Sequence, residues 1–222
     1  MILERIVSLG IGYVCGMFVS GFLLGKAKHV DLRKQGSGNI GTTNTLRVLG
    51  VPYALITLLC DVLKAIVAGV IVWLIFHGRV ADVNAQNLLM LYGAAGAVLG
   101  HDFPVVMKFK GGKGVATTLG LLLTCFPKCF LIEAVVFIGL VAIFRYVSLG
   151  SIIAMLTFLA QVILFGVIGG LYESNPYYLE MTIIVGGLVA LSIFLHRSNV
   201  KRLLSGTENK ISFHTNKTNE GV

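Results

Sequence analysis

Charged side chains are scarce in this sequence, and their scarcity excludes an ordinary soluble domain. Only 13% of the 222 residues are Asp, Glu, Lys or Arg, whereas 56% are hydrophobic. Soluble domains carry about 25% charged and about 45–50% apolar residues. The apolar residues lie in long runs that short polar stretches separate. This distribution predicts a single helical membrane domain.

Paired cysteines are also lacking. The four cysteines lie in or beside apolar runs and form no Cys-x-x-Cys pair, which is typical of small packing residues and predicts no disulfide framework or metal site. The net charge of +8 could suit nucleic acid, but the basic residues form short clusters between apolar runs, and no soluble domain could carry a binding groove. We therefore expect no nucleic acid, and an anionic substrate or anionic lipids as partners.

Seven segments are long and apolar enough, or nearly so, to cross a membrane, which takes about 20 mainly apolar residues. They cover residues 3–25, 52–76, 86–106, 115–127, 129–147, 150–171 and 177–195. The fourth is short, so it could be tilted, be half inserted, or begin deeper in the membrane. We predict an all-α integral membrane protein with seven transmembrane helices over residues 1–204 and a polar cytoplasmic tail over residues 205–222.

Lysine and arginine are divided unevenly between the two sides of this seven-helix arrangement. The connections on one side hold 14 of them and those on the other side hold 3. Cytoplasmic loops are enriched in these residues. The imbalance predicts that the N-terminus lies outside and the C-terminus in the cytoplasm.

The first cytoplasmic loop, residues 35–47, is rich in glycine, amide and hydroxyl groups. Glycines allow successive backbone N–H groups to turn toward an anion, and hydroxyls and Arg47 can add donors. A flexible turn is the simpler alternative, but it needs only one or two glycines, so we favour an anion site.

The second loop reads Gly111-Gly112-Lys113-Gly114 just before an apolar helix. A helix N-terminus offers free N–H groups to a phosphate. The loop is not a Walker A motif, which has a different order of residues. A basic turn at the membrane surface explains it equally well.

The third polar stretch, residues 196–208, follows the last apolar run. If the helix continues, His196 and Asn199 share a face. Taken alone, a patch that binds anionic lipid is the better interpretation. However, this stretch, the two loops and a small turn at Ser148 all fall on the predicted cytoplasmic side, and this convergence predicts one site at the membrane surface.

A few charges interrupt the apolar runs. Asp61 and Lys64 are three residues apart, so we expect an ion pair, either structural or at the edge of the site. Glu133 has no evident partner. His77 and Asp82 match the His-x-x-x-x-Asp spacing of soluble-type glycerolipid acyltransferases, but they fall on the predicted outer side, and we interpret the match as coincidence.

These three polar stretches resemble, in order, spacing and placement, the motifs of the bacterial acyl-phosphate:glycerol-3-phosphate acyltransferases, the PlsY family. The resemblance implies an enzyme of the bacterial plasma (inner) membrane. It would transfer a fatty acyl group from acyl phosphate to the sn-1 hydroxyl of glycerol 3-phosphate, giving lysophosphatidic acid and phosphate in the first acylation of phospholipid synthesis. Acyl phosphate, glycerol 3-phosphate and membrane lipids would be its partners, and the reaction would need no cofactor and no metal.

The resemblance also assigns roles. The candidate catalytic residues are Ser37, Arg47, His101, Lys113, His196 and Asn199. The candidate substrate-binding residues are Gly38, Asn39, Thr43, Asn44, Lys108, Gly111, Gly112, Gly114, Ser148, Arg202 and Glu208. His101 could be structural, a donor to the carbonyl oxygen, or a base, and Glu208 could orient Arg202. An anionic-solute transporter or a lipid-binding membrane protein is the alternative, although no internal repeat of the transporter kind is visible.

Overall fold

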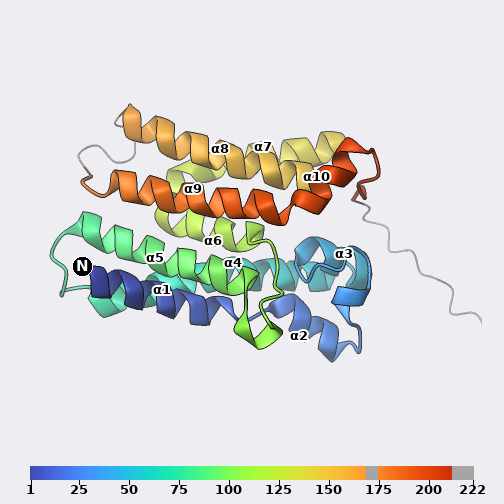
Figure 1. The fold of residues 1–222 in the computed structure, drawn as a ribbon, viewed down its shortest axis with the longest axis horizontal. Coiled ribbons are helices and arrows are strands. Elements are labelled where there is room, and N and C mark those ends of the chain that lie inside the picture. The colour runs from blue at the N-terminus through green and yellow to red at the C-terminus, as the bar shows by residue number, and fades with distance from the viewer. Residues whose placement is uncertain (169–174, 212–222) are drawn as a thin grey trace, which may run out of the picture.

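The computed structural model describes residues 1–168 and 175–211, and within these ranges it contains helices and no strand. The helices are α1 (Ile2–Gly16), α2 (Ser20–Ala27), α3 (Thr42–Leu49), α4 (Val51–Phe76), α5 (Val83–Asp102), α6 (Val115–Cys125), α7 (Phe130–Phe144), α8 (Val147–Val167), α9 (Tyr178–Leu195) and α10 (Arg197–Leu204). The long helices lie side by side along the longest axis of the molecule (Figure 1).

Six segments of the described chain are long and apolar enough to cross a membrane, which confirms a multi-pass membrane protein. They are Ile2–Ala27, Val51–Phe76, Val83–Met107, Pro127–Phe144, Val147–Val167 and Tyr178–Leu195. Each corresponds to one predicted span, with ends that differ by a few residues. The last three residues of the predicted span 150–171 and most of the predicted tail lie outside the described residues.

The first span is not the continuous helix that the sequence suggests, because residues 17–19 separate α1 from α2. The Lys64 ammonium donates a hydrogen bond to the carbonyl oxygen of Phe18 at 3.3 Å, within this break. Just beyond it, the Ser20 hydroxyl donates to the Asp61 carboxylate at 3.0 Å. Backbone polar groups at membrane depth need a partner inside the protein, and the charged pair on α4 supplies one.

Glycines let α1 approach α5 closely. A Cβ atom added at Gly12 would lie 1.8 Å from the carbonyl oxygen of Gly93, and one at Gly16 would lie 2.2 Å from that of Ala97. Small residues at such spacing are typical of close helix packing in membranes. The Gly-x-x-x-Gly pair in the first span therefore serves packing within the bundle.

The fourth predicted span, α6, has 11 residues, about 16 Å of helix against a hydrocarbon core of about 30 Å. A Cβ at Gly120 would touch the backbone of Val62, and the Thr124 side chain lies against Gly69, so α6 runs parallel to α4. The two contacts place the start of α6 about 9 to 14 Å beyond the start of α4 along the bundle. The tilted, half-inserted and deeper alternatives for the fourth span stay predictions.

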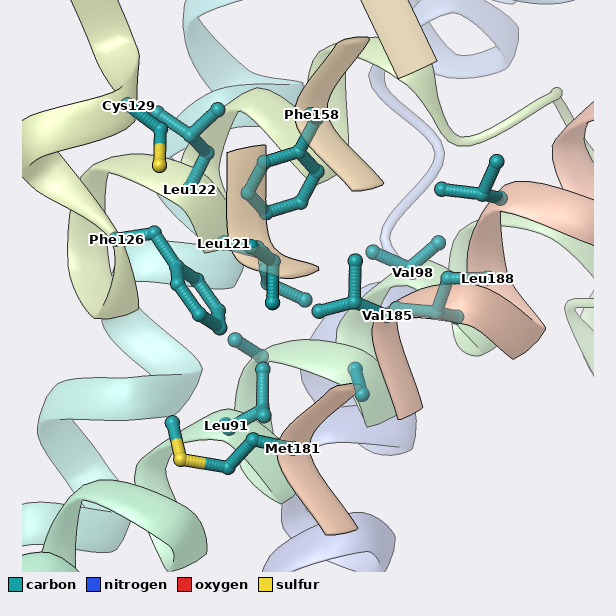
Figure 2. Close-up of a cluster of buried hydrophobic side chains, with 14 of the residues drawn as sticks. Leu91, Val98, Leu121, Leu122, Phe126, Cys129, Phe158, Met181, Val185 and Leu188 are labelled. Carbon is teal, nitrogen blue, oxygen red and sulfur yellow. The ribbon is translucent and has the colours of Figure 1, made fainter. Parts of the chain in front are cut away.

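The largest apolar cluster joins α5, α6, α8 and α9. Figure 2 shows Leu121 of α6 among side chains from these helices, and the rings of Phe126 and Phe158 meet edge to face with centroids 5.3 Å apart. This core fixes α6 and therefore the position of Lys113, which lies two residues before it.

A second polar contact ties helices together at the end of the bundle where α1 and α9 begin. The Arg5 guanidinium donates two hydrogen bonds to the Glu180 carboxylate at 2.6 and 2.7 Å, and the Tyr92 hydroxyl donates a third at 2.7 Å. Asp82 accepts a hydrogen bond from the Asn84 backbone at the start of α5, which gives this member of the His-x-x-x-x-Asp match a capping role.

Candidate active site

The carboxylate of Glu208 is the centre of a polar cluster at the end of the bundle that carries α10. It accepts hydrogen bonds from the Ser148 hydroxyl at 3.1 Å, the Asn199 side-chain amide at 2.9 Å and the Arg202 guanidinium at 2.7 Å. These donors lie on α8 and α10, so Glu208 holds the segment after α10 against both helices.

Lys113 joins this cluster from the second loop. Its ammonium donates a hydrogen bond to the amide oxygen of Asn199, whose amide nitrogen donates to Glu208. Burial, with repulsion from Arg202 and Arg47, lowers the pKa of Lys113 to about 8, and attraction to Glu208 only partly opposes this. A lysine so placed gains most from a second anion nearby.

Arg47, at the end of α3, is the contribution of the first loop. It is half-buried and donates a hydrogen bond to the backbone carbonyl of Asn209 at 3.2 Å. Within the described residues its Nε atom is buried and has no hydrogen-bond partner. Three cations, Arg47, Lys113 and Arg202, therefore surround the single carboxylate of Glu208, and the formal charge of the cluster is +2.

His196 lies at the junction of α9 and α10 and is buried. Its Nδ1 contacts the carbonyl oxygen of Ser192 at 2.8 Å, so Nδ1 carries the proton and the lone pair is on Nε2. Burial, together with repulsion from Lys113, lowers the pKa of His196 to about 4. The ring is neutral at physiological pH and can accept a hydrogen bond.

The glycines of the second loop have a packing role that the sequence did not reveal. The N–H groups of Gly111 and Gly112 donate to the carbonyl oxygens of Asp102 and His101 at 3.1 and 3.0 Å, so the loop folds back along the end of α5. A Cβ at Gly112 would lie 2.0 Å from Nε2 of His101. Gly114, with φ of +69°, starts α6. Their predicted contacts with phosphate stay predictions.

The first loop is held in shape by its own amide side chains. The buried Asn44 donates to the carbonyl oxygens of Leu32 and Gln35, both at 3.0 Å, and accepts from the Ser37 backbone at 2.8 Å. Asn39 accepts from the Gly41 backbone at 2.7 Å, ahead of α3. These contacts give both asparagines a structural role, whereas their predicted substrate contacts stay untested.

The remaining candidates lie farther from Glu208 or on the surface. Ser37, Gly38 and Lys108 are exposed, and Thr43 is partly buried. His101 is buried in a separate cluster, where the expected pair of Lys64 and Asp61 is confirmed at 2.9 Å. The candidates that the structure brings together are Arg47, Lys113, Ser148, His196, Asn199, Arg202 and Glu208.

The chain is similar to known proteins over most of its length. The family model described as "Glycerol-3-phosphate acyltransferase" matches residues 6–206. A glycerol-3-phosphate acyltransferase of Chlorobium phaeobacteroides is 40% identical, with 95% of this chain and 98% of that protein covered. One of Halalkalibacterium halodurans is 41% identical over 90% and 91%. The chain belongs to the glycerol-3-phosphate acyltransferase family.

Solved structures extend the family match to the fold. Crystal structures of PlsY (YgiH), an integral membrane glycerol 3-phosphate acyltransferase, have been determined in a glycerol 3-phosphate form and a lysophosphatidic acid form. They match with TM-scores of 0.78 and 0.76 at 31% and 30% identity, and each match covers 94% of this chain and 96% of the other. The resemblance of the three motifs to the PlsY family is thus confirmed.

Sequence reasoning missed Ser192 in this member of the family. Its carbonyl oxygen accepts from the His196 ring, and its hydroxyl lies 3.5 Å from the carbonyl oxygen of Lys113. It therefore links α9 to the second loop. The available signal was a hydroxyl four residues before a histidine at the end of an apolar run, which places both on one helix face.

Proposed function

We propose that the protein transfers a fatty acyl group from acyl phosphate to the sn-1 hydroxyl of glycerol 3-phosphate, giving lysophosphatidic acid and inorganic phosphate. The observation that carries this proposal is the surplus charge of Arg47, Lys113 and Arg202 around one carboxylate, at the end of an apolar helix bundle. A phosphate dianion matches a surplus of +2, and an acyl tail matches the apolar helices below it. The names of the relatives and of the PlsY structures support the acceptor and the product.

The donor is inferred from chemistry. Acyl phosphate is an activated mixed anhydride, so the acceptor hydroxyl can attack its carbonyl carbon directly. The new ester C–O bond forms while the bond from that carbon to the phosphate oxygen breaks. The hydroxyl proton passes to a phosphate oxygen, and the leaving phosphate departs with the bonding electrons.

Each side chain then has a role in positioning or charge stabilisation, which are large catalytic effects. Lys113 and Arg47 bind phosphate oxygens, and the Nε atom of Arg47, which has no hydrogen-bond partner among residues 1–168 and 175–211, supports this role. Nε2 of neutral His196 accepts a hydrogen bond from the glycerol hydroxyl and orients it. Asn199 holds Lys113 in place, and Glu208 holds Asn199 and Arg202.

The peripheral candidates complete the site in this proposal. Ser37 and the backbone of Gly38, with Asn39, Thr43 and Asn44, present the first loop to the substrate. Lys108 and the N–H groups of Gly111, Gly112 and Gly114 do the same from the second loop.

We also propose that the site faces the cytoplasm of a bacterial cell, across its plasma (inner) membrane. The bundle then has seven crossings, with α6 and the segment leading into α7 forming the fourth, and the N-terminus outside. The uneven distribution of lysine and arginine supports this orientation. A cysteine introduced at Lys110 should react with a membrane-impermeant maleimide only after cells are permeabilised, and reaction in intact cells would overturn the orientation.

The enzymatic proposal is tested by phosphate release from detergent-purified protein given palmitoyl phosphate. Release should depend on glycerol 3-phosphate and be matched by lysophosphatidic acid. A folded preparation that releases no phosphate, also after return to lipid, would contradict the proposal and favour anion transport or lipid binding.

A further inference from the structure

A second group of charged side chains, buried between α1, α2, α4 and α5, has no direct part in the proposed chemistry. Asp61, Lys64, His101 and Asp102 are between 1% and 7% exposed. Ionisable side chains inside a membrane bundle are costly and are usually functional. An ion pair alone would involve only Asp61 and Lys64, yet this group extends to His101.

The contact between Lys64 and His101 fixes the state of the imidazole ring. The Lys64 ammonium lies 2.5 Å from Nδ1 of His101 and also donates to Asp61 and to the Phe18 carbonyl. An ammonium can only donate, so Nδ1 must be the acceptor and the ring proton must be on Nε2. Of the roles left open for His101, that of a general base is disfavoured, because Lys64 occupies the lone pair of Nδ1.

The Nε2 edge of the His101 ring faces residues 111–112 of the second loop. The two backbone hydrogen bonds from Gly111 and Gly112 to the end of α5 hold this loop segment against the imidazole. The next residue is Lys113, whose ammonium reaches Asn199. A chain of direct contacts therefore runs from Lys64 through His101 and residues 111–112 to Lys113, and so to the polar cluster around Glu208.

We propose that Asp61 and Lys64 are positioning residues for the acyl transfer. They hold His101 as its Nε2–H tautomer against Gly112, and thereby position Lys113 in the polar cluster around Glu208. Asp61 supports this arrangement by accepting hydrogen bonds from Lys64 and Ser20 at 2.9 and 3.0 Å. The inference rests on the proposed function of Lys113, but the tautomer can be tested without any activity.

The variant that separates positioning from simple charge balance is the double substitution Asp61→Asn/Lys64→Met. It removes both members of the ion pair together, so neither is left without the other, and the thermal unfolding midpoint should stay within a few degrees of the native value. The donor to Nδ1 is lost, so kcat/KM for glycerol 3-phosphate should fall at least about tenfold, because small misplacements of catalytic groups have large effects on rate. Native kcat/KM in the folded double variant would overturn the proposal.

Glu133→Gln is the matched control. Glu133 is another buried carboxylate of the bundle. It lies on α7 and accepts a hydrogen bond from Gln161 of α8, not from the helices that hold His101. This variant should keep native kcat/KM. A loss equal to that of the double variant would show that any buried polar substitution has this effect, and would contradict a specific role for Asp61 and Lys64.

The tautomer is measured separately by nitrogen NMR of histidine-labelled protein, with the signals of His101 assigned from a His101→Gln sample. We expect an unprotonated Nδ1 in the native protein and a changed signal in the double variant. A proton on Nδ1 in the native protein would overturn this inference. An inactive native protein would instead overturn the proposed function and leave the NMR result valid.

Discussion

The two ends of the helix bundle each contain an arginine–glutamate pair, but they differ in charge balance. At one end Arg5 and Glu180 neutralise each other, and the Tyr92 hydroxyl adds a neutral donor. At the other end Arg202 and Glu208 are joined by two further cations, Lys113 and Arg47. Similar ion-pair geometry thus ties helices together at one end and leaves a positive surplus at the other, and from that surplus we infer an affinity for phosphate.

Removing Lys113 should have the largest effect, because it removes a cation from the surplus without breaking the Arg202–Glu208 pair. Lys113→Ala should lower kcat by about 10²- to 10³-fold, as expected for loss of one preorganised donor to developing charge. Phosphate release assays on purified protein would measure this. Lys110→Ala, at an exposed position in the same loop, is the control, and equal losses in both variants would contradict the assignment.

Removing the Glu208 carboxylate should lower activity, whereas removing the Glu180 carboxylate at the other end should not. Glu208→Ala leaves Asn199, Ser148 and Arg202 without their shared acceptor, so kcat/KM for glycerol 3-phosphate should fall roughly 10²-fold through misplacement of the site. Glu208→Gln keeps an acceptor and should lose less. A Glu208→Ala enzyme with native kinetics would show that the carboxylate does not organise the site.

The pH dependence should report the lowered pKa of Lys113. That group is protonated below its pKa of about 8 and neutral above it, so kcat/KM should be highest below pH 8 and fall about tenfold per unit above it. Bound phosphate stabilises the ammonium, so the decline in kcat should occur at higher pH. In Lys113→Arg, which stays charged, the alkaline decline should disappear. An unchanged decline in that variant would assign it to another group.

The smallest effect on turnover is expected at the balanced end. Glu180→Ala breaks a partly exposed pair, so it should lower the free energy of unfolding by about 1 kcal/mol, or about 2–4 °C in Tm for a chain of this size. Thermal unfolding would measure the loss. Turnover per folded molecule should be native, and a selective loss of turnover would contradict the contrast between the two ends.

Much of this architecture could be predicted from the sequence because apolar runs and basic loops are governed by the bilayer. The six long apolar segments and the pairing of Asp61 with Lys64 followed from that constraint. The break after α1 could not be predicted, because residues 17–19 are as apolar as the helices around them. The partner that stabilises the break, Lys64, lies on another helix and is far away in the sequence.

Resemblance to the family motifs singled out Lys113, Asn199, Arg202 and Glu208, and these four side chains are in contact in the structure. The hydrogen bonds by which the amide of Asn44 holds the loop backbone could not be predicted, because their acceptors are carbonyl oxygens that only the folded loop brings near it. Spacing reveals which side chains share a loop, whereas three-dimensional packing decides which of their atoms remain available to a ligand.

The most direct test is a crystal structure of this protein with glycerol 3-phosphate bound. The phosphate should lie within hydrogen-bonding distance of the Lys113 ammonium and the Arg47 guanidinium, with a glycerol hydroxyl at Nε2 of His196. A phosphate bound away from Lys113, with the contacts between Lys113, Asn199 and Glu208 unchanged, would contradict the assignment of the active site to this cluster.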